Sequence, residues 1–551
     1  MTTISPHAAS APATAGSGVA SVAEWLTTTD HKRIGRLYLG AGALLLLATG
    51  AISVLLGIER ISPDREWLPV GSLTQLFSLQ RFGLTYLVLL PLVVGVATAI
   101  VPLQVGARSL AFPRLAAGGF WLWLLGAGLG LFAIINNGGP GGGNPRFVEL
   151  FILSAALVLA GLLATVVSVV TSVLTTRAPG MNMRRLPYFT WSVLVAGLGL
   201  VVALPVLIGN LLYLYISYRY QSLSELAGNR SLAQWAGFGF TQPTTLLFAI
   251  PALGLLADTV ATATRQRLRP RGIIYTGIGL VGVAVFATVL QFPATLRPGF
   301  ISAAFGDQLS DLLPFLMVHG LPLLGCFVAV ALSAKGLAAK PKVNAPLVFA
   351  LFASLTLLGA VAANAVNHVG DAALGGTTFE EGTWLAVVFA GVLTAMGAVA
   401  YWGPKWWGRT MPAKATLPLA LLAFGGAQLA SLPLLVAGFA NQPGGVFPSV
   451  ESVQPGVTDL VVNFNYSGPM ELWNILSTAG HALVLLAVLA FVALAMRSFL
   501  KGEAAGDDPF DGQTLEWATT SPAPFDNFAE VHIVKSAEPL LDLKPANRSD
   551  A

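Results

Sequence analysis

The sequence predicts an all-α polytopic membrane protein with twelve transmembrane helices. Of its 551 residues, 55% are hydrophobic and 10% are charged, whereas soluble domains carry about 25% charged residues. Twelve apolar runs are each long enough to cross about 30 Å of hydrocarbon as a helix. The loops between these runs alternate in charge, which indicates how the chain is threaded through a bilayer.

The apolar runs divide the chain into three parts. Residues 1–27 are polar and small, without the apolar core of a cleavable signal peptide, and we expect a disordered cytoplasmic segment there. Residues 28–499 hold the twelve-helix membrane domain, and residues 500–551 form a polar cytoplasmic tail. The runs lie near 36–57, 82–104, 118–135, 147–175, 189–215, 236–262, 273–293, 311–334, 345–367, 383–403, 415–437 and 473–498.

Basic residues concentrate in the loops that follow the even-numbered runs. The opposite loops hold few Lys or Arg and many acids. By the positive-inside rule, both termini are cytoplasmic and the chain is a multi-pass protein of the cell membrane. The net charge of +4 then reflects topology, so we expect the lipid bilayer and no nucleic acid as a partner. The basic loop residues are Arg108, Arg114, Arg177, Arg184, Arg185, Arg265, Arg267, Arg269, Arg271, Lys335, Lys340, Lys342, Lys405, Arg409 and Lys414.

The sixth apolar run contains a polar interruption at Gln242-Pro243-Thr244-Thr245. A proline inside a membrane helix frees a backbone carbonyl that neighbouring groups must satisfy, and such interruptions often mark the working centre of a membrane protein. These side chains are amides and hydroxyls, which neither titrate near neutral pH nor hold a transition metal well. The single cysteine, Cys326, excludes an intrachain disulfide framework.

Five sequence blocks, taken together, resemble subunit I of the heme-copper terminal oxidases, of the actinobacterial cytochrome c oxidase type. TTDHKRIGRLYLG (28–40) is similar to the start of that subunit, and RAPGMNMRRLPYFTWSVLV (177–195) resembles its RAPGMTMFRMPIFTWNILV. The resemblance spans nearly the whole chain and implies the family's twelve-helix fold. The other blocks are VPLQVGARSLAFPRL (101–115), YWGPKWWGR (401–409) and DGQTLEWATTSPAPFDNF (511–528).

The resemblance also implies cofactors, because the family binds two hemes and one copper ion through six histidines. This chain has six histidines in all, and His7, His31 and His532 lie in its polar ends. At most three histidines can therefore reach the membrane interior, which excludes the family's complete set of six ligands. Matching the motifs places Gln80, Gly382 and Trp384 at the heme-ligand positions and Gln242, Gln291 and Phe292 at the copper-ligand positions. No heme, copper or other metal is expected.

The proton routes of the family are replaced in the same way. The resemblance places Ser109 and Ala116 along one proton channel, Thr244 at the proton-delivering glutamate and Leu246 at the cross-linked tyrosine. The lysine of the second channel falls on Cys326, Phe327 or Val328, and the pair of arginines that would hold heme propionates falls on Gln442-Pro443-Gly444-Gly445. His368 and Asp371 retain a likeness to a residual polar pair of the family.

The remaining polar residues have simpler interpretations. A lone histidine in a helical bundle is usually a hydrogen-bonding residue, which is how we interpret His319, His368 and His481. Glu380 and Glu381 precede a membrane run and are expected to be solvated. Asp258 is expected to face the membrane interface beside Arg265.

The function predicted from these residues is that of a catalytically inactive subunit, without heme, copper or proton channels. It would be an accessory or scaffold subunit of a respiratory oxidase-type complex, with other membrane subunits of that complex as partners. One alternative is a functional cytochrome c oxidase subunit I whose ligands are not placed by the motifs. Another is a membrane transporter or channel that reuses the vacated interior, which would require a charge at mid-depth in the membrane.

Overall fold

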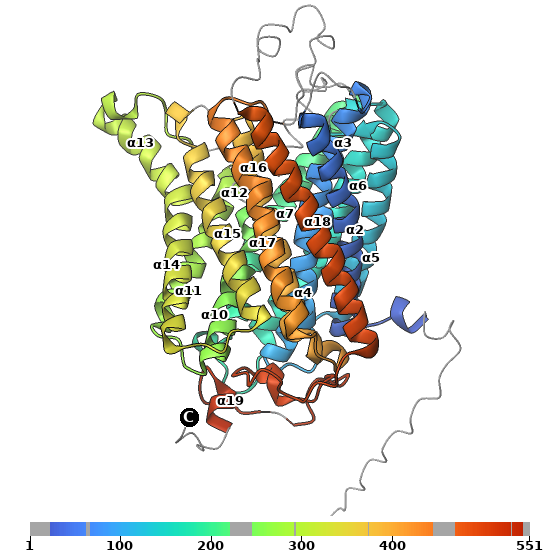
Figure 1. Cartoon of the computed structure of the whole chain (residues 1–551), viewed down its shortest axis with the longest axis vertical. Helices are drawn as coiled ribbons and strands as arrows, with labels where there is room; N and C mark the ends of the chain where they lie inside the picture. Colours follow the sequence, from blue (N-terminus) through green and yellow to red (C-terminus); the bar gives the residue numbers. More distant parts are fainter. Residues whose placement is uncertain are drawn as a thin grey trace, which may run out of the picture.

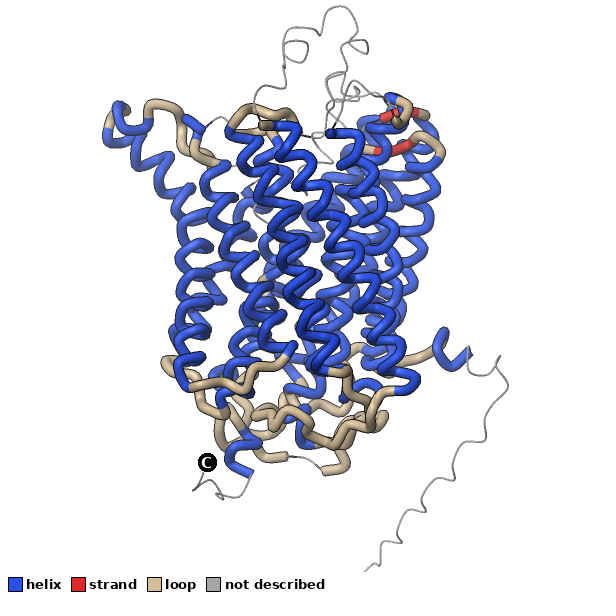
Figure 2. Tube along the Cα trace, in the orientation of Figure 1, coloured by secondary structure: helices blue, strands red, loops and turns tan. Residues whose placement is uncertain are grey.

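The chain folds into a bundle of long, nearly parallel helices (Figure 1; Figure 2). This computed structural model describes residues 23–61, 67–140, 142–220, 245–290, 294–372, 374–444, 469–530 and 532–543. Within these residues, twelve helices are long and apolar enough to cross a membrane. The number of transmembrane helices expected from the sequence is therefore confirmed.

Several of the twelve spans are built from shorter helices joined end to end. The first six spans are α2 (His31–Ile61); α3 (Val70–Phe82) with η1 (Gly83–Leu89) and α4 (Leu90–Gln104); α5 (Pro113–Ile135); α6 (Pro145–Thr175); α7 (Tyr188–Tyr220); and α9 (Leu246–Ala249) with α10 (Pro251–Thr264). The other six are α11 (Arg271–Val281) with η4 (Gly282–Val285) and α12 (Phe286–Leu290); α13 (Phe305–Phe315) with η6 (Leu316–Gly320), α14 (Leu321–Lys335) and η7 (Gly336–Ala339); α15 (Ala345–Asn367); α16 (Thr378–Trp407); α17 (Ala413–Phe439); and α18 (Met470–Lys501).

Short elements connect or follow the spans. The connections contain two short strands, β1 (Gly138–Gly139) and β2 (Gly142–Gly143), which pair antiparallel. They also contain η2 (Met183–Arg185), η5 (Phe300–Ser302) and η8 (Gly370–Ala372), and the C-terminal segment contains η9 (Leu515–Ala518) and α19 (Pro539–Leu543).

Burial separates central spans from peripheral ones. The most apolar windows of the spans Gln75–Gln104 and Leu246–Thr264 are 100% buried, and that of Thr378–Trp407 is 94% buried. The corresponding windows of α2 and α18 are only 28% buried. The positions that the resemblance assigns to heme ligands therefore lie on the central spans, away from lipid.

Small residues allow neighbouring helices to approach closely. A Cβ atom on Gly119 of α5 would lie 2.6 Å from the carbonyl oxygen of Gly161 on α6, and a Cβ on Gly161 would lie 2.6 Å from the Gly119 oxygen. Any side chain at either position would force the two backbones apart. Close approach through small residues is the usual way in which helices associate in lipid.

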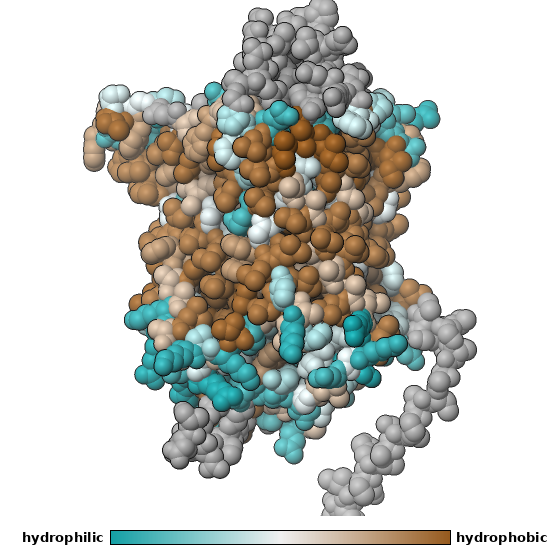
Figure 3. Space-filling model, viewed as in Figure 1, coloured by the Kyte–Doolittle hydropathy of each residue, from teal (hydrophilic) through white to brown (hydrophobic). Residues whose placement is uncertain are grey.

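The surface distribution of side chains fits a membrane environment. In Figure 3, hydrophobic residues cover the middle of the visible face, and hydrophilic residues gather at the end of the bundle where the C-terminal segment lies. We call this end the tail face, defined by residues 502–543. Figure 1 shows the C-terminal segment folded across it.

Candidate functional site: the positions assigned to cofactor ligands

Gln80 lies in the last turn of α3 and is 3% exposed. Its Nε2 donates a hydrogen bond to Ser53 Oγ on α2 over 3.0 Å, and Ser53 Oγ donates to the Thr49 carbonyl over 2.9 Å. The amide is thus engaged by a neighbouring helix. A buried amide left without such partners would cost free energy.

A buried ion pair lies beside Gln80. The Arg60 Nη2 and Glu381 Oε2 atoms are 2.8 Å apart, and the two side chains are 8% and 4% exposed. Glu381 lies in the first turn of α16, where the helix dipole favours a negative charge. The expectation that Glu381 is solvated is wrong: it is 3% exposed, because side chains of α2, α3 and α18 surround it.

Further polar side chains complete a cluster around this pair. Asn474 Nδ2 donates to the Arg60 carbonyl over 3.2 Å, and Gln442 Nε2 donates to Asn474 Oδ1 over 3.0 Å. His481 of α18 lines the same small cavity. We call this group the Arg60 cluster: Ser53, Arg60, Gln80, Glu381, Asn474 and His481.

Gly382 and Trp384, the other two assigned heme positions, lie on α16 next to Glu381. A Cβ atom on Gly382 would lie 2.8 Å from the Ser431 carbonyl oxygen of α17, so this site has no room for a side chain. Trp384 is 6% exposed, and its Nε1 donates to Thr85 Oγ1 of η1 over 2.9 Å. The indole therefore fills the space between α16 and the central span that carries Gln80, formed by α3, η1 and α4.

The residues at these positions do not fit a heme. An amide, a glycine and an indole offer no imidazole, thiolate, thioether or phenolate to iron, and the amide and indole N–H groups already bond to neighbouring hydroxyls. The cavity bordered by Gln80, Glu381 and His481 measures about 10 Å³, which is room for roughly one water molecule.

Gln242, Thr244, Gln291 and Phe292 lie outside the described residues. Leu246 begins α9 and is 1% exposed, within the hydrophobic core. Across the described ranges, no three His, Cys, Asp or Glu side chains form a group that could hold a metal ion.

The assigned proton-channel positions that the structure describes carry no charged side chain. Ser109 is exposed, and its hydroxyl donates to the Leu110 carbonyl over 3.2 Å. Ala116 is fully buried and has no polar side-chain atom; its carbonyl accepts from Thr165 Oγ1 over 3.3 Å. Cys326 is buried within α14.

His319 and His368 stack against each other, with ring centroids 4.2 Å apart and an interplanar angle of 27°. His319 Nδ1 hydrogen-bonds with Asn364 Nδ2 over 3.1 Å, and His368 Nδ1 with the Asn364 carbonyl over 2.8 Å. Burial lowers the pKa of His368 below its ordinary value. These bonds agree with the interpretation of both histidines as hydrogen-bonding residues. Asp371 lies in the adjacent η8.

A second buried polar network, which sequence reasoning missed, joins the tail to the bundle. Gln104 Nε2 donates to Glu516 Oε1 over 3.1 Å and to Asp258 Oδ2 over 3.3 Å. Asp258 in turn accepts the backbone N–H groups of Tyr188 and Phe189, both over 3.0 Å, and so satisfies the start of α7. The expectation that Asp258 faces the interface is therefore wrong, since it is 5% exposed.

The sequence blocks that carry the family resemblance meet at the tail face. Asn527 of the tail block accepts hydrogen bonds at Oδ1 from Lys32 Nζ over 2.9 Å and pairs with His31 Nε2 over 3.0 Å. Its Nδ2 donates to the Ala107 carbonyl over 2.8 Å. One tail side chain thus joins the block at 28–40 to the block at 101–115.

The remaining blocks join the same assembly. Lys405 Nζ donates to the carbonyls of Asp507 and Thr519, over 2.6 and 2.5 Å. The Ala178 N–H donates to the Val105 carbonyl over 2.8 Å. All five blocks are therefore connected by hydrogen bonds among themselves.

The twelve apolar spans, with the positions that the resemblance assigns to heme ligands on the central spans, are those of a polytopic membrane protein of the terminal-oxidase class. The chain belongs to the family described as Cytochrome C and Quinol oxidase polypeptide I, whose model matches residues 33–483.

Named relatives and a solved structure support this membership. Cytochrome c oxidase subunit 1 of Bacillus subtilis is 26% identical over 544 residues, covering 95% of this chain and 83% of the relative. A probable cytochrome c oxidase subunit 1-beta of Nocardia farcinica is 28% identical, covering 97% and 90%. A heme-copper terminal oxidase dimer solved by cryo-EM matches with a TM-score of 0.64 at 15% identity, covering 92% of this chain and 88% of that one, and shows the likeness in fold.

Proposed function

We propose that this chain is a non-catalytic member of its family, without heme, copper or proton pathways. It would serve as an accessory or scaffold subunit of a respiratory oxidase-type complex in the cell membrane. The proposal is carried by how the side chains at the assigned heme positions are packed and hydrogen-bonded. Gln80 and Trp384 are committed to Ser53 and Thr85, and Gly382 has no room for a side chain.

The packing around these positions supports the same conclusion. A vacated cofactor space would leave a large cavity, and cavities in helical cores are destabilising in proportion to their volume. Here the Trp384 indole packs against η1, the Arg60 cluster fills the space among α2, α3, α16 and α18, and about 10 Å³ remains beside Gln80. Repacking therefore supplies stability that a bound heme would otherwise supply.

We propose that the tail face is cytoplasmic, which places both termini there. The basic loop residues that predicted this orientation bind tail acids at this face. Arg265 Nε lies 2.9 Å from Asp511 Oδ2, and Arg271 Nη1 lies 2.6 Å from Glu538 Oε1. Positive charge on one side of the bundle is what the positive-inside rule requires.

The five retained sequence blocks meet at the tail face, where they bind one another. Because the five blocks bind each other across the tail face, folding of this face is enough to explain their retention. The scaffold role is therefore tested by identifying the proteins that bind this chain. A pull-down in mild detergent should recover redox-active oxidase subunits, and their absence would contradict the role.

The central experiment is a reduced-minus-oxidised visible spectrum of the purified protein, with iron and copper quantified on the same sample. We expect no heme bands and far less than one metal ion per chain. Near-stoichiometric heme and metal would overturn the proposal in favour of a functional oxidase subunit.

The transporter alternative gains no support from the Arg60–Glu381 pair. Arg60 is the penultimate residue of α2, and Glu381 lies in the first turn of α16. The pair therefore sits near the ends of two spans, whereas a membrane pathway needs charge at mid-depth.

A further inference from the structure

An apolar groove runs along the periphery of the bundle between α2 and α18, with α16 as its floor. Its volume is about 270 Å³, far larger than the cavity beside Gln80. We call it the α2–α18 groove. The residues used below to define it are Gly40 and Leu46 of α2, Met396 and Trp406 of α16, and Phe491 and Phe499 of α18.

Glycines along α2 show why the groove exists. A Cβ on Gly57 would lie 2.6 Å from Thr478 Oγ1, and a Cβ on Gly50 would lie 3.2 Å from Leu485 Cδ1, both on α18. A Cβ on Gly40 would meet no atom within 4 Å. The two helices therefore pack closely at the end away from the tail and separate toward the tail face.

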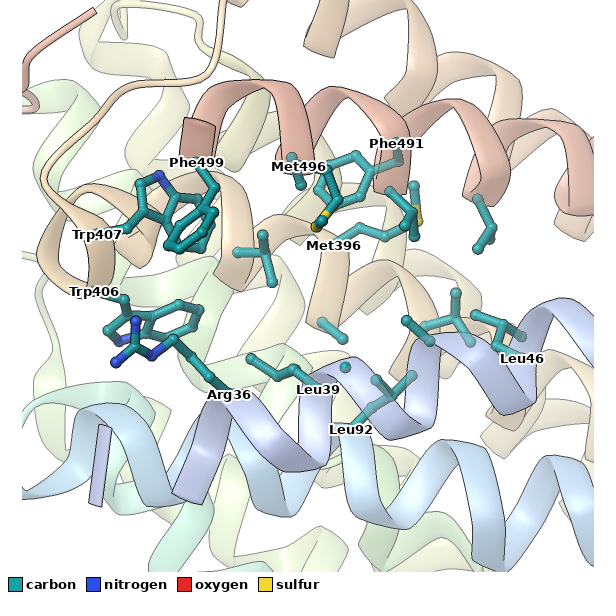
Figure 4. A pocket seen from close by; sticks show the side chains of 18 of the residues that line it. Arg36, Leu39, Leu46, Leu92, Met396, Trp406, Trp407, Phe491, Met496 and Phe499 are labelled. Atoms are coloured by element: carbon teal, nitrogen blue, oxygen red, sulfur yellow. The ribbon is translucent and has the colours of Figure 1, made fainter. Parts of the chain in front are cut away.

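The groove is chemically asymmetric along its length. Figure 4 shows Arg36, Trp406 and Trp407 at one end and Leu46 near the other, with Met396 and Phe491 between them. The Arg36 Nε donates to the Lys32 carbonyl over 3.3 Å, and its guanidinium carbon lies 5.0 Å from the Trp25 ring centroid.

The aromatic end of the groove is formed by Trp406 and Trp407. The indole N–H groups of Trp406 and Trp407 make no hydrogen bond within the part of the chain that the structure describes. Trp406 is only 3% exposed. The indole nitrogens themselves are buried, so the two rings contribute apolar aromatic surface beside the cationic side chain of Arg36, as interfacial tryptophans do.

The length of the groove matches one leaflet of a bilayer. Ten residues separate Arg36 from Leu46, which is about 15 Å along a helix, or about half of the ~30 Å hydrocarbon core. The cationic and aromatic end lies near the tail face, at the level where headgroups and interfacial tryptophans are found. Met396 and Met496 supply flexible walls that adapt to a hydrocarbon chain.

We propose that the α2–α18 groove binds one anionic phospholipid. One acyl chain lies along the groove from Trp406 toward Leu46, and the phosphate lies within reach of the Arg36 guanidinium. The charge of Arg36 selects an anionic headgroup, since each basic residue near the membrane surface favours anionic lipid. This site is independent of whether the chain binds heme.

The test uses delipidated full-length protein and native mass spectrometry after addition of phosphatidylglycerol or phosphatidylcholine. We expect one retained phosphatidylglycerol per chain and weaker retention of phosphatidylcholine. Gly40→Phe adds a ring at a groove residue whose Cβ would meet no atom within 4 Å, so the ring competes with the lipid for the groove. Each acyl-chain methylene that leaves the apolar groove weakens lipid binding by about 0.8 kcal/mol. If the added ring displaces two or three methylenes, retention of the lipid should fall by about tenfold or more.

The matched control is Gly128→Phe on α5, another exposed glycine whose Cβ would meet no atom within 4 Å. It should leave lipid retention unchanged.

Arg36→Gln should reduce the preference for phosphatidylglycerol over phosphatidylcholine by about fivefold. Equal retention by Gly40→Phe and Gly128→Phe would overturn the site, and an unchanged preference in Arg36→Gln would overturn the phosphate contact. Lipid binding that appears only when residues 1–22 are deleted would assign the groove to that segment instead.

Discussion

Breaking the buried pair of Arg60 and Glu381 gives the sharpest test of how the interior is held together. Glu381→Gln preserves the shape of the side chain but removes the negative charge that lies 2.8 Å from the Arg60 guanidinium, in a pair whose side chains are 8% and 4% exposed. Removing one partner of a buried pair costs about 3–5 kcal/mol, because the remaining charge stays buried and uncompensated. An amide oxygen still accepts a hydrogen bond from Arg60, so we expect about 3 kcal/mol.

The single cysteine provides the assay. Cys326 is fully buried, so a thiol-reactive fluorogenic dye reports unfolding as the detergent-solubilised protein is heated. The Glu381→Gln variant should become reactive at a clearly lower temperature than the parent chain.

Glu380→Gln is the matched control, one residue away. Glu380 Oε2 accepts a hydrogen bond from the Gly376 N–H over 3.1 Å in an exposed position, so its loss should cost less than about 1 kcal/mol. Equal shifts for the two variants would refute the assignment of Glu381 to a buried pair. Replacing both partners, as Arg60→Met with Glu381→Met, should recover much of the loss, because an apolar pair carries no desolvation penalty.

Three further predictions concern the tail and α16. Burial raises the pKa of the Glu516 carboxyl; stability from its protonated form is full below the unfolded pKa and is lost as pH rises through the folded pKa. Proteolysis of the tail should therefore accelerate with rising pH, and Glu516→Gln should weaken that dependence, while Asp258 remains in the same buried network. Gly382→Leu should destabilise by about 1–3 kcal/mol, because its Cβ would press on the Ser431 carbonyl. Trp384→Phe should cost more than the ~1 kcal/mol of the lost hydrogen bond to Thr85, because the smaller ring also leaves a cavity.

Each of these has its own control. Proteolysis that stays constant with pH in the parent chain would contradict the role of Glu516. Gly359→Leu on α15, where a Cβ would meet no atom within 4 Å, should leave the unfolding temperature nearly unchanged, and a shift as large as that of Gly382→Leu would argue against a specific clash. Thr85→Val should lower the unfolding temperature less than Trp384→Phe, because it removes the shared hydrogen bond without reducing the volume of the ring, and an equal or larger shift would argue that the indole does not fill this space.

The sequence by itself determined the membrane class, the number of spans and the family. Hydropathy is a local property of about twenty consecutive residues, so each span can be recognised in the sequence without knowledge of the helices that pack against it. The motifs around 101–115 and 177–195 likewise carry the family resemblance in consecutive letters, and the family model confirms it. The identity of the side chains at Gln80, Gly382 and Trp384 was also readable from the chain alone.

Only the tertiary structure decided which polar residues are buried and with whom. Arg60 and Glu381 are 321 positions apart in the chain, and Glu381 on its own looks like a solvated acid before a helix. Asp258 was misplaced for the same reason, because its partners at the start of α7 are far away in sequence. The separation of α2 from α18 that creates the groove depends on how two whole helices cross. Pairings of this kind are fixed by packing between distant segments, which no local pattern encodes.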